Sequence, residues 1–332
     1  MRSVVLKEFG EPERLISEIT EDPHPGAGQV LVDVEAAGVN YLDLTQRSGA
    51  SQVHLIELPT VLGLEGVGRV RALGEGVNEA ATGLSVGTRV AWVDVRGSYA
   101  SQAVIPAARA VTVPDAFSVN EGLLFQALTA HYLVHEYRAI RAGDRVLVHA
   151  AAGGLGQLLV QWLKHLGAWV VGTTSSDLKA DAIRAAGADA VVVYGSDYEF
   201  VAEVSRLTDQ KGVDLAFDGL GAKTLLKTIA TLGRGGTVVA IGAASGPIPS
   251  ITPTLLTQRG LRLAGGSVFS YIADPAELRR RSADVIAAIQ AGWLKLDGAT
   301  PYSLDRAADA HRDIESRQAK GKLYLDPNFL NQ

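Results

Sequence analysis

Residues 145–174 read RVLVHAAAGGLGQLLVQWLKHLGAWVVGTT, and this stretch predicts a strand, a glycine turn, a helix and a second strand. Residues 145–149 form a short run rich in β-branched side chains, and residues 169–173 supply the second buried strand. The helix between them carries its large apolar side chains on one stripe, as expected of a helix that covers a sheet. This stripe consists of Leu155, Leu158, Leu159, Trp162, Leu163 and Leu166.

The turn, residues 151–156, fits the pattern G-x-G-x-x-G with alanine in the first glycine place. Gly153 would let the backbone approach a pyrophosphate, Gly156 would let the helix pack on the strand, and free helix N–H groups would face the phosphates. Glycine turns are common, and a purely structural turn is the alternative. Here the pattern follows a strand and opens an amphipathic helix, so we expect a dinucleotide-binding fold.

Composition limits the classes of function. A chain of 332 residues has room for about two domains, and its net charge of −5 gives no general attraction to nucleic acid or membranes. No stretch approaches the ~18 consecutive apolar residues of a membrane span, and the amino terminus has no apolar signal core. We therefore expect a cytoplasmic protein. The chain has no cysteine, which excludes disulfides, thiol catalysis and cysteine-ligated zinc.

The first 115 residues are typical of a β-rich region, with strand-like runs at 30–34, 66–73 and 89–93 between glycine and proline turns. From about residue 119 strands and helices alternate. Alternation with strands that are apolar on both faces predicts an α/β fold with a doubly wound parallel sheet. In this part and after it we predict further strands at residues 190–194, 213–218, 236–241, 261–265 and 322–325, and helices at residues 121–136, 177–186, 223–232 and 275–291.

Several other stretches carry a family resemblance: AGVNYLD at 37–43, LGLEGVG at 62–68, VGTRV at 86–90, GDRVLVHAAAGGLG at 143–156, residues 214–221 and ESR at 315–317. Together they resemble the zinc-free, zeta-crystallin-like quinone oxidoreductases of the medium-chain dehydrogenase/reductase superfamily. The resemblance implies a GroES-like β-rich substrate domain at 1–119 and 266–332 and a Rossmann domain at 120–265. It also implies a cleft where nicotinamide meets substrate, and usually a homodimer.

Zinc-dependent relatives carry a cysteine and a histidine at two places of these motifs, where this chain has Asn40 and Leu64. A catalytic Zn²⁺ needs three protein ligands, and the seven histidines are scattered. His131 and His135 have the i, i+4 spacing that would ligate a metal, but no third ligand is evident. We therefore predict chemistry without a metal.

The end of the second Rossmann strand indicates which nucleotide binds. NAD-specific sites place an acidic residue there, about 20 residues after the glycine turn. Here residues 172–176 read GTTSS, and the small hydroxyl side chains leave room for a 2′-phosphate. Asp177 stands where a helix N-cap would be, so capping is its expected role. Lys179 follows within reach of the phosphate, its alternative role being that of an exposed helix lysine. The predicted cofactor is NADPH.

The predicted cofactor-binding residues come from the glycine turn, from the ends of strands and from the resemblance. Small residues after strand 236–241 would let the backbone approach the nicotinamide ribose, and the resemblance places Asn40, Thr129, Tyr194, Phe269, Arg317 and Lys322 near the nucleotide. Structural alternatives remain: turn stabilisation for Asn40, packing for Tyr194 and a surface role for Arg317. The full set is Asn40, Thr129, Ala152, Gly153, Gly154, Leu155, Gly156, Thr174, Ser175, Ser176, Lys179, Tyr194, Gly219, Ile241, Gly242, Ala244, Phe269, Arg317 and Lys322.

The sequence shows no prominent acid, base or nucleophile constellation. We therefore predict hydride transfer from NADPH to a quinone or similar conjugated carbonyl, with water supplying the proton. Asn40 and Tyr41 are the predicted catalytic residues, although Thr45 stands where the family often has tyrosine. The nearest alternative is an enoyl or enone double-bond reductase of the same superfamily. An alternative of another class is a non-enzymatic NADPH-binding protein with a structural or RNA-binding role.

Overall fold

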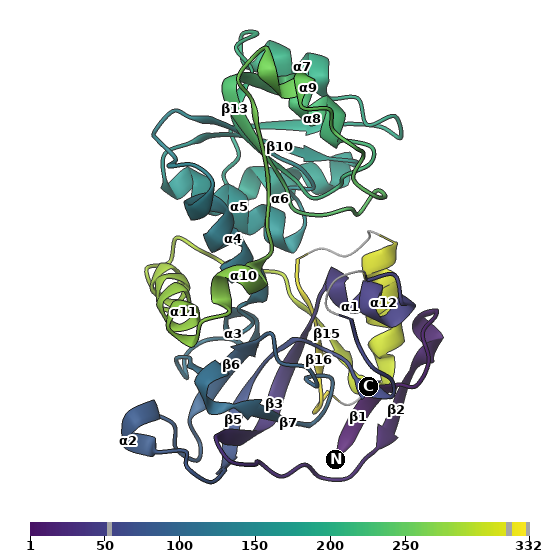
Figure 1. Ribbon diagram of the computed structural model, residues 1–332, viewed down its shortest axis with the longest axis vertical. Coiled ribbons are helices and arrows are strands. Elements are labelled where there is room, and N and C mark those ends of the chain that lie inside the picture. Colours follow the sequence, from purple (N-terminus) through teal and green to yellow (C-terminus); the bar gives the residue numbers. More distant parts are fainter. Residues whose placement is uncertain (52–54, 317–320, 330–332) are drawn as a thin grey trace. The chain divides into compact units, whose positions relative to one another are not determined.

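The computed structural model describes residues 1–51, 55–316 and 321–329, and its contacts divide the chain into two compact units (Figure 1). Unit 1 comprises Met1–Phe125, Asp274–Ile286 and Leu296–Gln332. Unit 2 comprises Gln126–Ala273 and Ala287–Lys295. The two ends of the chain therefore fold together, and the middle of the chain forms a separate body.

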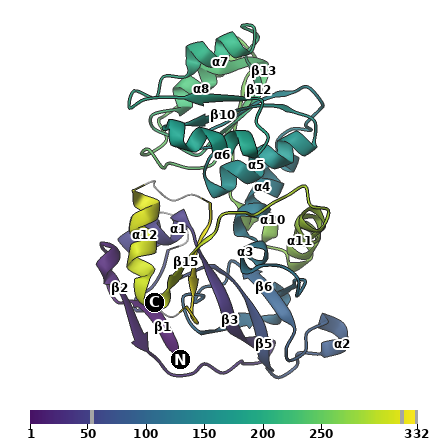
Figure 2. The same ribbon diagram turned by 180° about the vertical axis from the view of Figure 1, so that it is seen from behind.

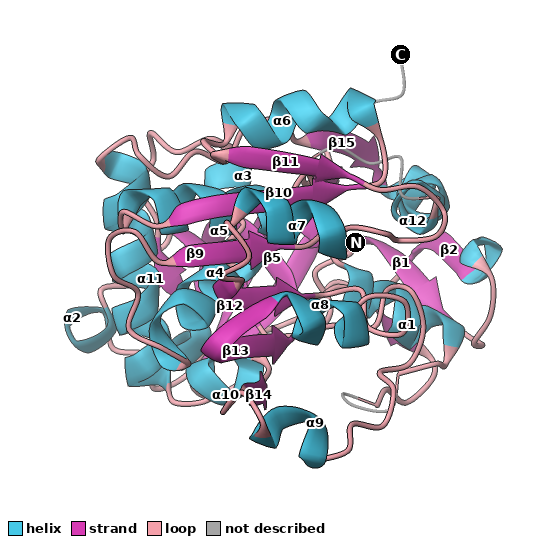
Figure 3. Ribbon diagram, turned by 90° about the horizontal axis from the view of Figure 1, so that it is seen from above, coloured by secondary structure: helices cyan, strands magenta, loops and turns pink. Residues whose placement is uncertain are grey.

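Unit 2 is a parallel sheet with helices on both faces. Its strands lie in the order β11-β10-β9-β12-β13-β14, and neighbours pair in parallel throughout (Figure 3). Helices α5 and α6 cover one face and α7 and α8 the other (Figures 1 and 2). The strands are β9 (Arg145–Val148), β10 (Trp169–Thr174), β11 (Ala190–Val193), β12 (Val213–Asp218), β13 (Leu232–Ala240) and β14 (Arg262–Gly265). The helices are α4 (Phe125–Glu136), α5 (Gly154–His165), α6 (Ala180–Ala185), α7 (Val201–Leu207), α8 (Leu225–Thr231), α9 (Thr254–Thr257) and α10 (Val268–Ile272), with a 3₁₀ turn η3 (Asp177–Lys179).

The central strands of this sheet are apolar on both faces because helices cover both faces. In β9, Val146, Leu147 and Val148 are fully buried, and Val146 lies between Val170 of β10 and Leu215 of β12. The strand order, with the first strand of the unit in the middle, is that of a Rossmann sheet. The predicted doubly wound parallel sheet is confirmed.

Unit 1 is built around an antiparallel sheet to which both ends of the chain contribute. Strand β3 pairs with β5, β7 and β16, and the last of these comes from the carboxyl-terminal end of the chain. The strands are β1 (Arg2–Leu6), β2 (Leu15–Ile19), β3 (Gln29–Val39), β4 (Thr60–Val61), β5 (Glu65–Leu73), β6 (Arg89–Val93), β7 (Gln102–Pro106), β8 (Val111–Thr112), β15 (Thr300–Ser303) and β16 (Leu323–Asp326). The helices are α1 (Tyr41–Ser48), α2 (Glu79–Thr82), α3 (Val119–Gly122), α11 (Pro275–Gln290), whose residues from Ala287 on belong to unit 2, and α12 (Ala307–Glu315). The 3₁₀ turns are η1 (Pro12–Arg14), η2 (Ala107–Arg109) and η4 (Leu304–Arg306).

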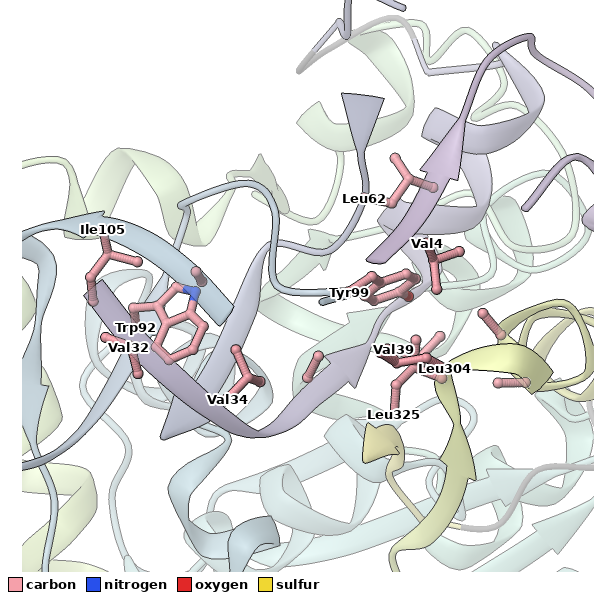
Figure 4. Packing of buried hydrophobic residues seen from close by; sticks show 14 of the residues in the cluster. Val4, Val32, Val34, Val39, Leu62, Trp92, Tyr99, Ile105, Leu304 and Leu325 are labelled. Carbon is pink, nitrogen blue, oxygen red and sulfur yellow. The ribbon is translucent and has the colours of Figure 1, made fainter. Parts of the chain in front are cut away.

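Alternation along the strands of unit 1 separates its core from its surface. In β5, Val67 and Val70 are buried whereas Arg69 and Arg71 are exposed, as expected of a sheet with one covered face. Figure 4 shows the resulting core, in which Trp92 packs among apolar side chains of β3 and β7. Leu325 of β16 belongs to the same cluster, so the carboxyl-terminal strand is part of this core.

The prediction of one continuous helix over residues 121–136 is wrong. The stretch forms two helices, α3 and α4, separated by Leu123 and Leu124, and Leu123 has extended backbone. The Glu65 carboxylate accepts a hydrogen bond from the N–H of Phe125 at 3.0 Å, which satisfies a donor at the start of α4. This contact joins residues that are far apart in sequence, and helical periodicity does not reveal it.

The helix predicted over residues 177–186 also begins differently. Asp177 is the first residue of η3, and Ser176 occupies the cap position without a side-chain capping bond. Asp177 is exposed, and α6 itself starts at Ala180. The predicted capping role of Asp177 is therefore wrong.

The close contact of Gly156 beneath the glycine turn predicts that a Cβ at Gly156 costs more stability than a Cβ at Gly153. A Cβ at Gly156 would lie 2.5 Å from the carbonyl oxygen of Ala150 and 2.6 Å from Cα of Ala151. A Cβ at Gly153 would meet only Ala150 O, at 3.3 Å, and its backbone suits alanine. Gly156→Ala should lower the free energy of unfolding by about 2 kcal/mol through overpacking. Gly153→Ala is the matched control and should cost clearly less in urea denaturation. Equal losses would contradict the contact.

Candidate functional site

Residues 149–153 join β9 to α5 and include the first part of the glycine turn. Ala150 has a left-handed backbone, with φ 50°, and its carbonyl accepts a hydrogen bond from the N–H of Gly153 at 2.9 Å. Gly153 stands at the N-cap position of α5 and supplies no side-chain acceptor. A twelve-residue helix that begins in this way presents backbone N–H groups and a positive dipole end to an anion.

Four other parallel strands of unit 2 end beside predicted cofactor residues. Thr174 ends β10, Tyr194 follows β11, Gly219 follows β12 and Ile241 follows β13. Carboxyl ends of parallel strands meet at one edge of a sheet, which is where open α/β sheets bind ligands. The edge therefore gathers the predicted residues of these strands together with the glycine turn.

The loops after β12 and β13 are held together closely. The N–H of Ile241 donates to the carbonyl of Asp218 at 2.8 Å, and the N–H of Ala244 donates to that of Gly219 at 3.2 Å. A Cβ at Gly242 would lie 2.7 Å from the carbonyl oxygen of Gly219. Glycine at 242 is thus required by loop packing as well as compatible with a nearby ribose.

The remaining predicted residues of unit 2 differ in exposure. Ser175 is exposed, whereas Ser176 and Lys179 are half-buried. Tyr194 is buried and stacks on Tyr198, with ring centroids 5.0 Å apart, which matches the packing alternative. The half-buried residues Thr129 and Phe269 lie on α4 and α10. Arg317 lies outside the described residues.

A buried polar network, which the sequence did not predict, lies behind this edge. His149 Nδ1 is 2.8 Å from Thr173 Oγ1, and His149 Nε2 is 2.9 Å from Thr228 Oγ1. Thr228 Oγ1 donates to Asp218 Oδ2 at 2.8 Å. Burial lowers the pKa of His149 to about 4, against the opposite effect of the Asp218 charge, so the ring is neutral at pH 7. The only sequence signal was a polar residue, His149, at the end of an apolar strand.

Unit 1 brings Asn40 and Lys322 together around Glu65. Lys322 Nζ forms an ion pair with Glu65 Oε1 and donates to Asn40 Oδ1 at 2.8 Å. Asn40 Nδ2 donates to Glu65 Oε1 at 2.8 Å. Glu65 is fully buried, and Asn40 and Lys322 are 4% and 5% exposed. Each charge therefore has a partner, as a buried ion pair requires. We call Asn40, Glu65 and Lys322 the Glu65 cluster.

A second layer of polar groups lies beneath Asn40. Asp43 Oδ2 accepts hydrogen bonds from the Asn40 N–H at 2.8 Å and from the Tyr99 hydroxyl at 3.0 Å. The same hydroxyl is 3.1 Å from His311 Nε2. Burial raises the pKa of Asp43 to about 7 although both hydrogen bonds lower it, and burial lowers the pKa of His311 to about 3. This layer fixes the start of α1, where Tyr41 is half exposed.

The histidine pair on α4 packs against a tryptophan of α5. The rings of His131 and His135 are 4.5 Å apart, and both meet the edge of Trp162 on α5, at 5.4 and 5.9 Å. Across the described ranges, no group of three or more histidine, cysteine or acidic residues has the arrangement of a metal site. Within the same ranges, no helix is long and apolar enough to cross a membrane.

Comparison with known proteins gives consistent matches over both units. Residues 26–115 match the family described as alcohol dehydrogenase GroES-like domain, and residues 154–286 match zinc-binding dehydrogenase. The chain is 34% identical to a 2-haloacrylate reductase of Burkholderia over 98% of each protein. It is 32% identical to quinone oxidoreductase 1 of Escherichia coli over 98% of this chain and 99% of the other. A mycobacterial protein solved in complex with NADPH is 38% identical, with a TM-score of 0.93 over 98% of this chain and 100% of that one.

The Glu65 cluster predicts a stability effect. Lys322→Met leaves the Glu65 carboxylate buried without its cation, which should lower the free energy of unfolding by about 3–5 kcal/mol in urea denaturation. Glu65→Gln in the same chain removes the stranded charge and should restore part of the loss. Lys7→Met is the matched control because it breaks an exposed pair with Glu18, 2.7 Å long, and should cost at most about 1 kcal/mol. Equal losses for Lys322→Met and Lys7→Met would contradict the buried pair.

His149 predicts a pH dependence of stability. Its pKa is about 4 in the folded protein and about 6.5 when unfolded, so the unfolded chain binds the extra proton between these values. The contribution of His149 to stability is therefore complete above pH 6.5 and is lost as the pH falls toward 4. In His149→Asn, the fall in unfolding free energy from pH 7 to pH 5 should be smaller than in the unmodified chain by about 2 kcal/mol. The exposed His24→Asn should keep the unmodified slope, and an unchanged slope in His149→Asn would refute the assignment.

Proposed function

The chain belongs to the quinone oxidoreductases of the medium-chain dehydrogenase/reductase superfamily, and we propose that it transfers hydride from NADPH to a quinone or similar conjugated carbonyl. One observation carries the choice of cofactor. The glycine turn opens α5 at the edge where β10 ends at Thr174; Ser175 and Ser176 follow, and the first carboxylate after them is the exposed Asp177. A mycobacterial relative was solved with NADPH, which agrees with this choice.

We propose which residues at the carboxyl ends of the parallel strands bind each part of the nucleotide. The backbone of Ala152–Gly156 would hold the pyrophosphate, and Ser175, Ser176 and Lys179 would hold the 2′-phosphate. The residues after β12 and β13, namely Gly219, Ile241, Gly242 and Ala244, would line the nicotinamide ribose. Thr129, Tyr194, Phe269, Arg317 and Lys322 complete the proposed set. When bound, NADPH supplies the hydride.

Asn40 is the residue that we propose to orient the substrate carbonyl. The Glu65 cluster fixes its amide, since Oδ1 accepts from Lys322 and Nδ2 donates to Glu65. An amide nitrogen carries two hydrogens, so a second N–H of Asn40 can donate to a carbonyl oxygen. Tyr41, next in sequence and half exposed, supplies a hydroxyl at the same helix start. A quinone accepts hydride readily, and water delivers the proton to the product anion.

Reduction of a carbon–carbon double bond is the second candidate. A relative at 34% identity is a 2-haloacrylate reductase, whose name specifies a substrate with a conjugated double bond. Such a reaction would use the same hydride donor and would likewise require a group that polarises a carbonyl oxygen.

We further propose a cytoplasmic homodimer, and sedimentation equilibrium should give twice the chain mass of 34.9 kDa.

The function predicts a metal-independent activity. Purified protein should oxidise NADPH in the presence of small quinones, prefer NADPH to NADH, and keep its rate when a chelator is added. Turnover of enones or 2-haloacrylate without quinones would move the assignment to the double-bond reductase. NADPH binding without any turnover would favour a non-enzymatic role. Loss of activity to the chelator would contradict chemistry without a metal.

The 2′-phosphate site predicts a change of cofactor preference. Lys179→Met should raise KM for NADPH about tenfold, because one charge-assisted hydrogen bond to a phosphate is lost, and leave KM for NADH unchanged. Lys211→Met is the matched control, since this exposed lysine precedes β12 at the opposite end of the strand. Equal effects of Lys179→Met on both nucleotides would show that this lysine does not read the phosphate.

A further inference from the structure

We call the carboxyl ends of β9, β10, β12 and β13, with the loops that follow them, the cofactor edge. The hydrogen bonds of the buried network behind this edge run in a fixed direction from donor to acceptor. Thr228 Oγ1 has one proton and two acceptors for it, Asp218 Oδ2 at 2.8 Å and the Thr224 carbonyl at 3.0 Å. Whichever acceptor takes that proton, Thr228 can only accept from His149. His149 Nε2 therefore carries the ring hydrogen and donates it to Thr228.

The other ring nitrogen follows from the first. A neutral imidazole has one donor and one acceptor, so Nδ1 accepts the hydroxyl proton of Thr173. The bonds thus run one way, from Thr173 through His149 to Thr228, and the nearer acceptor of the Thr228 proton is Asp218 Oδ2. We call these four residues the His149 relay. All four are at least 95% buried, so water does not compete for their hydrogen bonds.

The relay joins the ends of three neighbouring strands. Thr173 is on β10, His149 follows β9 and Asp218 ends β12, while Thr228 comes from α8, which covers one face of the sheet. These strands are adjacent in the order β10-β9-β12. The relay therefore sets the relative positions of three strand ends through side chains, in addition to the backbone ladder.

Each end of the relay also holds backbone of the cofactor edge. The carbonyl of Thr173 accepts the N–H of Ala151, in the glycine turn, at 3.0 Å. Asp218 Oδ1 accepts the N–H groups of Leu220 and Gly221, at 2.9 and 3.0 Å, which shapes the loop after β12. That loop in turn binds Ala244 through the carbonyl of Gly219. The glycine turn, which we assign to the pyrophosphate, and the loops after β12 and β13, which we assign to the nicotinamide ribose, are thus connected through one buried chain of hydrogen bonds.

We propose that His149 and Thr228 are positioning residues for the cofactor, which hold the glycine turn and the loop after β12 at the spacing that NADPH requires. This role rests on the proposed function, because it concerns the binding of NADPH. Neither residue touches the reacting atoms. Loss of the relay weakens binding of the nucleotide and leaves the rate at saturating NADPH unchanged.

The experiment compares three variants of α8. Thr228→Val keeps the shape of the side chain but removes the hydroxyl, whereas Thr228→Ser keeps the hydroxyl. Thr231→Val is the matched control, since Thr231 is also buried on α8 but donates only to the carbonyl of Thr228, at 2.7 Å. The dissociation constant for NADPH is measured by fluorescence, kcat and KM by quinone reduction, and the His149 tautomer by ¹⁵N NMR.

We expect Thr228→Val to raise Kd and KM for NADPH about tenfold at unchanged kcat, as for the loss of about one buried hydrogen bond. Thr228→Ser and Thr231→Val should stay within about twofold of the unmodified protein. The NMR spectrum of the unmodified protein should show the Nε2–H tautomer of a neutral ring.

Two results would overturn the relay alone: equal Kd for Thr228→Val and Thr231→Val, or the Nδ1–H tautomer. Failure of the unmodified protein to bind NADPH is a separate result. It would overturn the proposed function, and the positioning role with it, even if the tautomer is as expected.

Discussion

The close contact of Gly156 with the backbone of Ala150 and Ala151 is the constraint on which unit 2 depends. A Cβ at Gly156 would lie 2.5 Å from Ala150 O, so glycine at this position lets the first turn of α5 pack against the backbone that follows β9. Because the helix starts there, its free N–H groups lie at the edge where β10, β12 and β13 also end. We propose that the small hydroxyl residues at the end of β10 select the nucleotide, because a carboxylate in their place would repel a 2′-phosphate.

Unit 1 holds a cluster of charged and polar side chains in its core. The family resemblance implies that zinc-dependent relatives have a cysteine and a histidine at the positions of Asn40 and Leu64. Here the buried carboxylate of Glu65 is neutralised by the ammonium of Lys322, and both hold the Asn40 amide in one orientation. A rigid amide donor can polarise a carbonyl oxygen, and little more is needed when the acceptor is a quinone. Glu65 also binds the N–H of Phe125 at the start of α4, so the same carboxylate stabilises the fold.

The sequence pattern predicted the features that depend on residues close together in the sequence. The strands at 89–93 and 213–218 have the predicted bounds, and the packing role of Gly156 could be predicted because a strand, a turn and an apolar stripe follow one another in sequence. At the interruption of the helix over 121–136, the N–H of Phe125 binds the carboxylate of Glu65, some sixty residues away. The pairing of Lys322 with Glu65, 257 residues apart, was equally invisible; the family resemblance supplied Lys322, and nothing supplied its partner. The His149 relay escaped prediction for the same reason, since its members share no local motif.

A crystal structure of the protein soaked with NADPH would show directly whether the glycine turn and the end of β10 bind the nucleotide. We expect density for the pyrophosphate against the backbone of Ala152–Gly156, with the 2′-phosphate beside Ser175 and Lys179. We also expect Gly156 to remain in contact with Ala150 and the His149 relay to keep its hydrogen bonds. Nucleotide bound elsewhere on the chain, or a 2′-phosphate directed away from the end of β10, would contradict this binding mode.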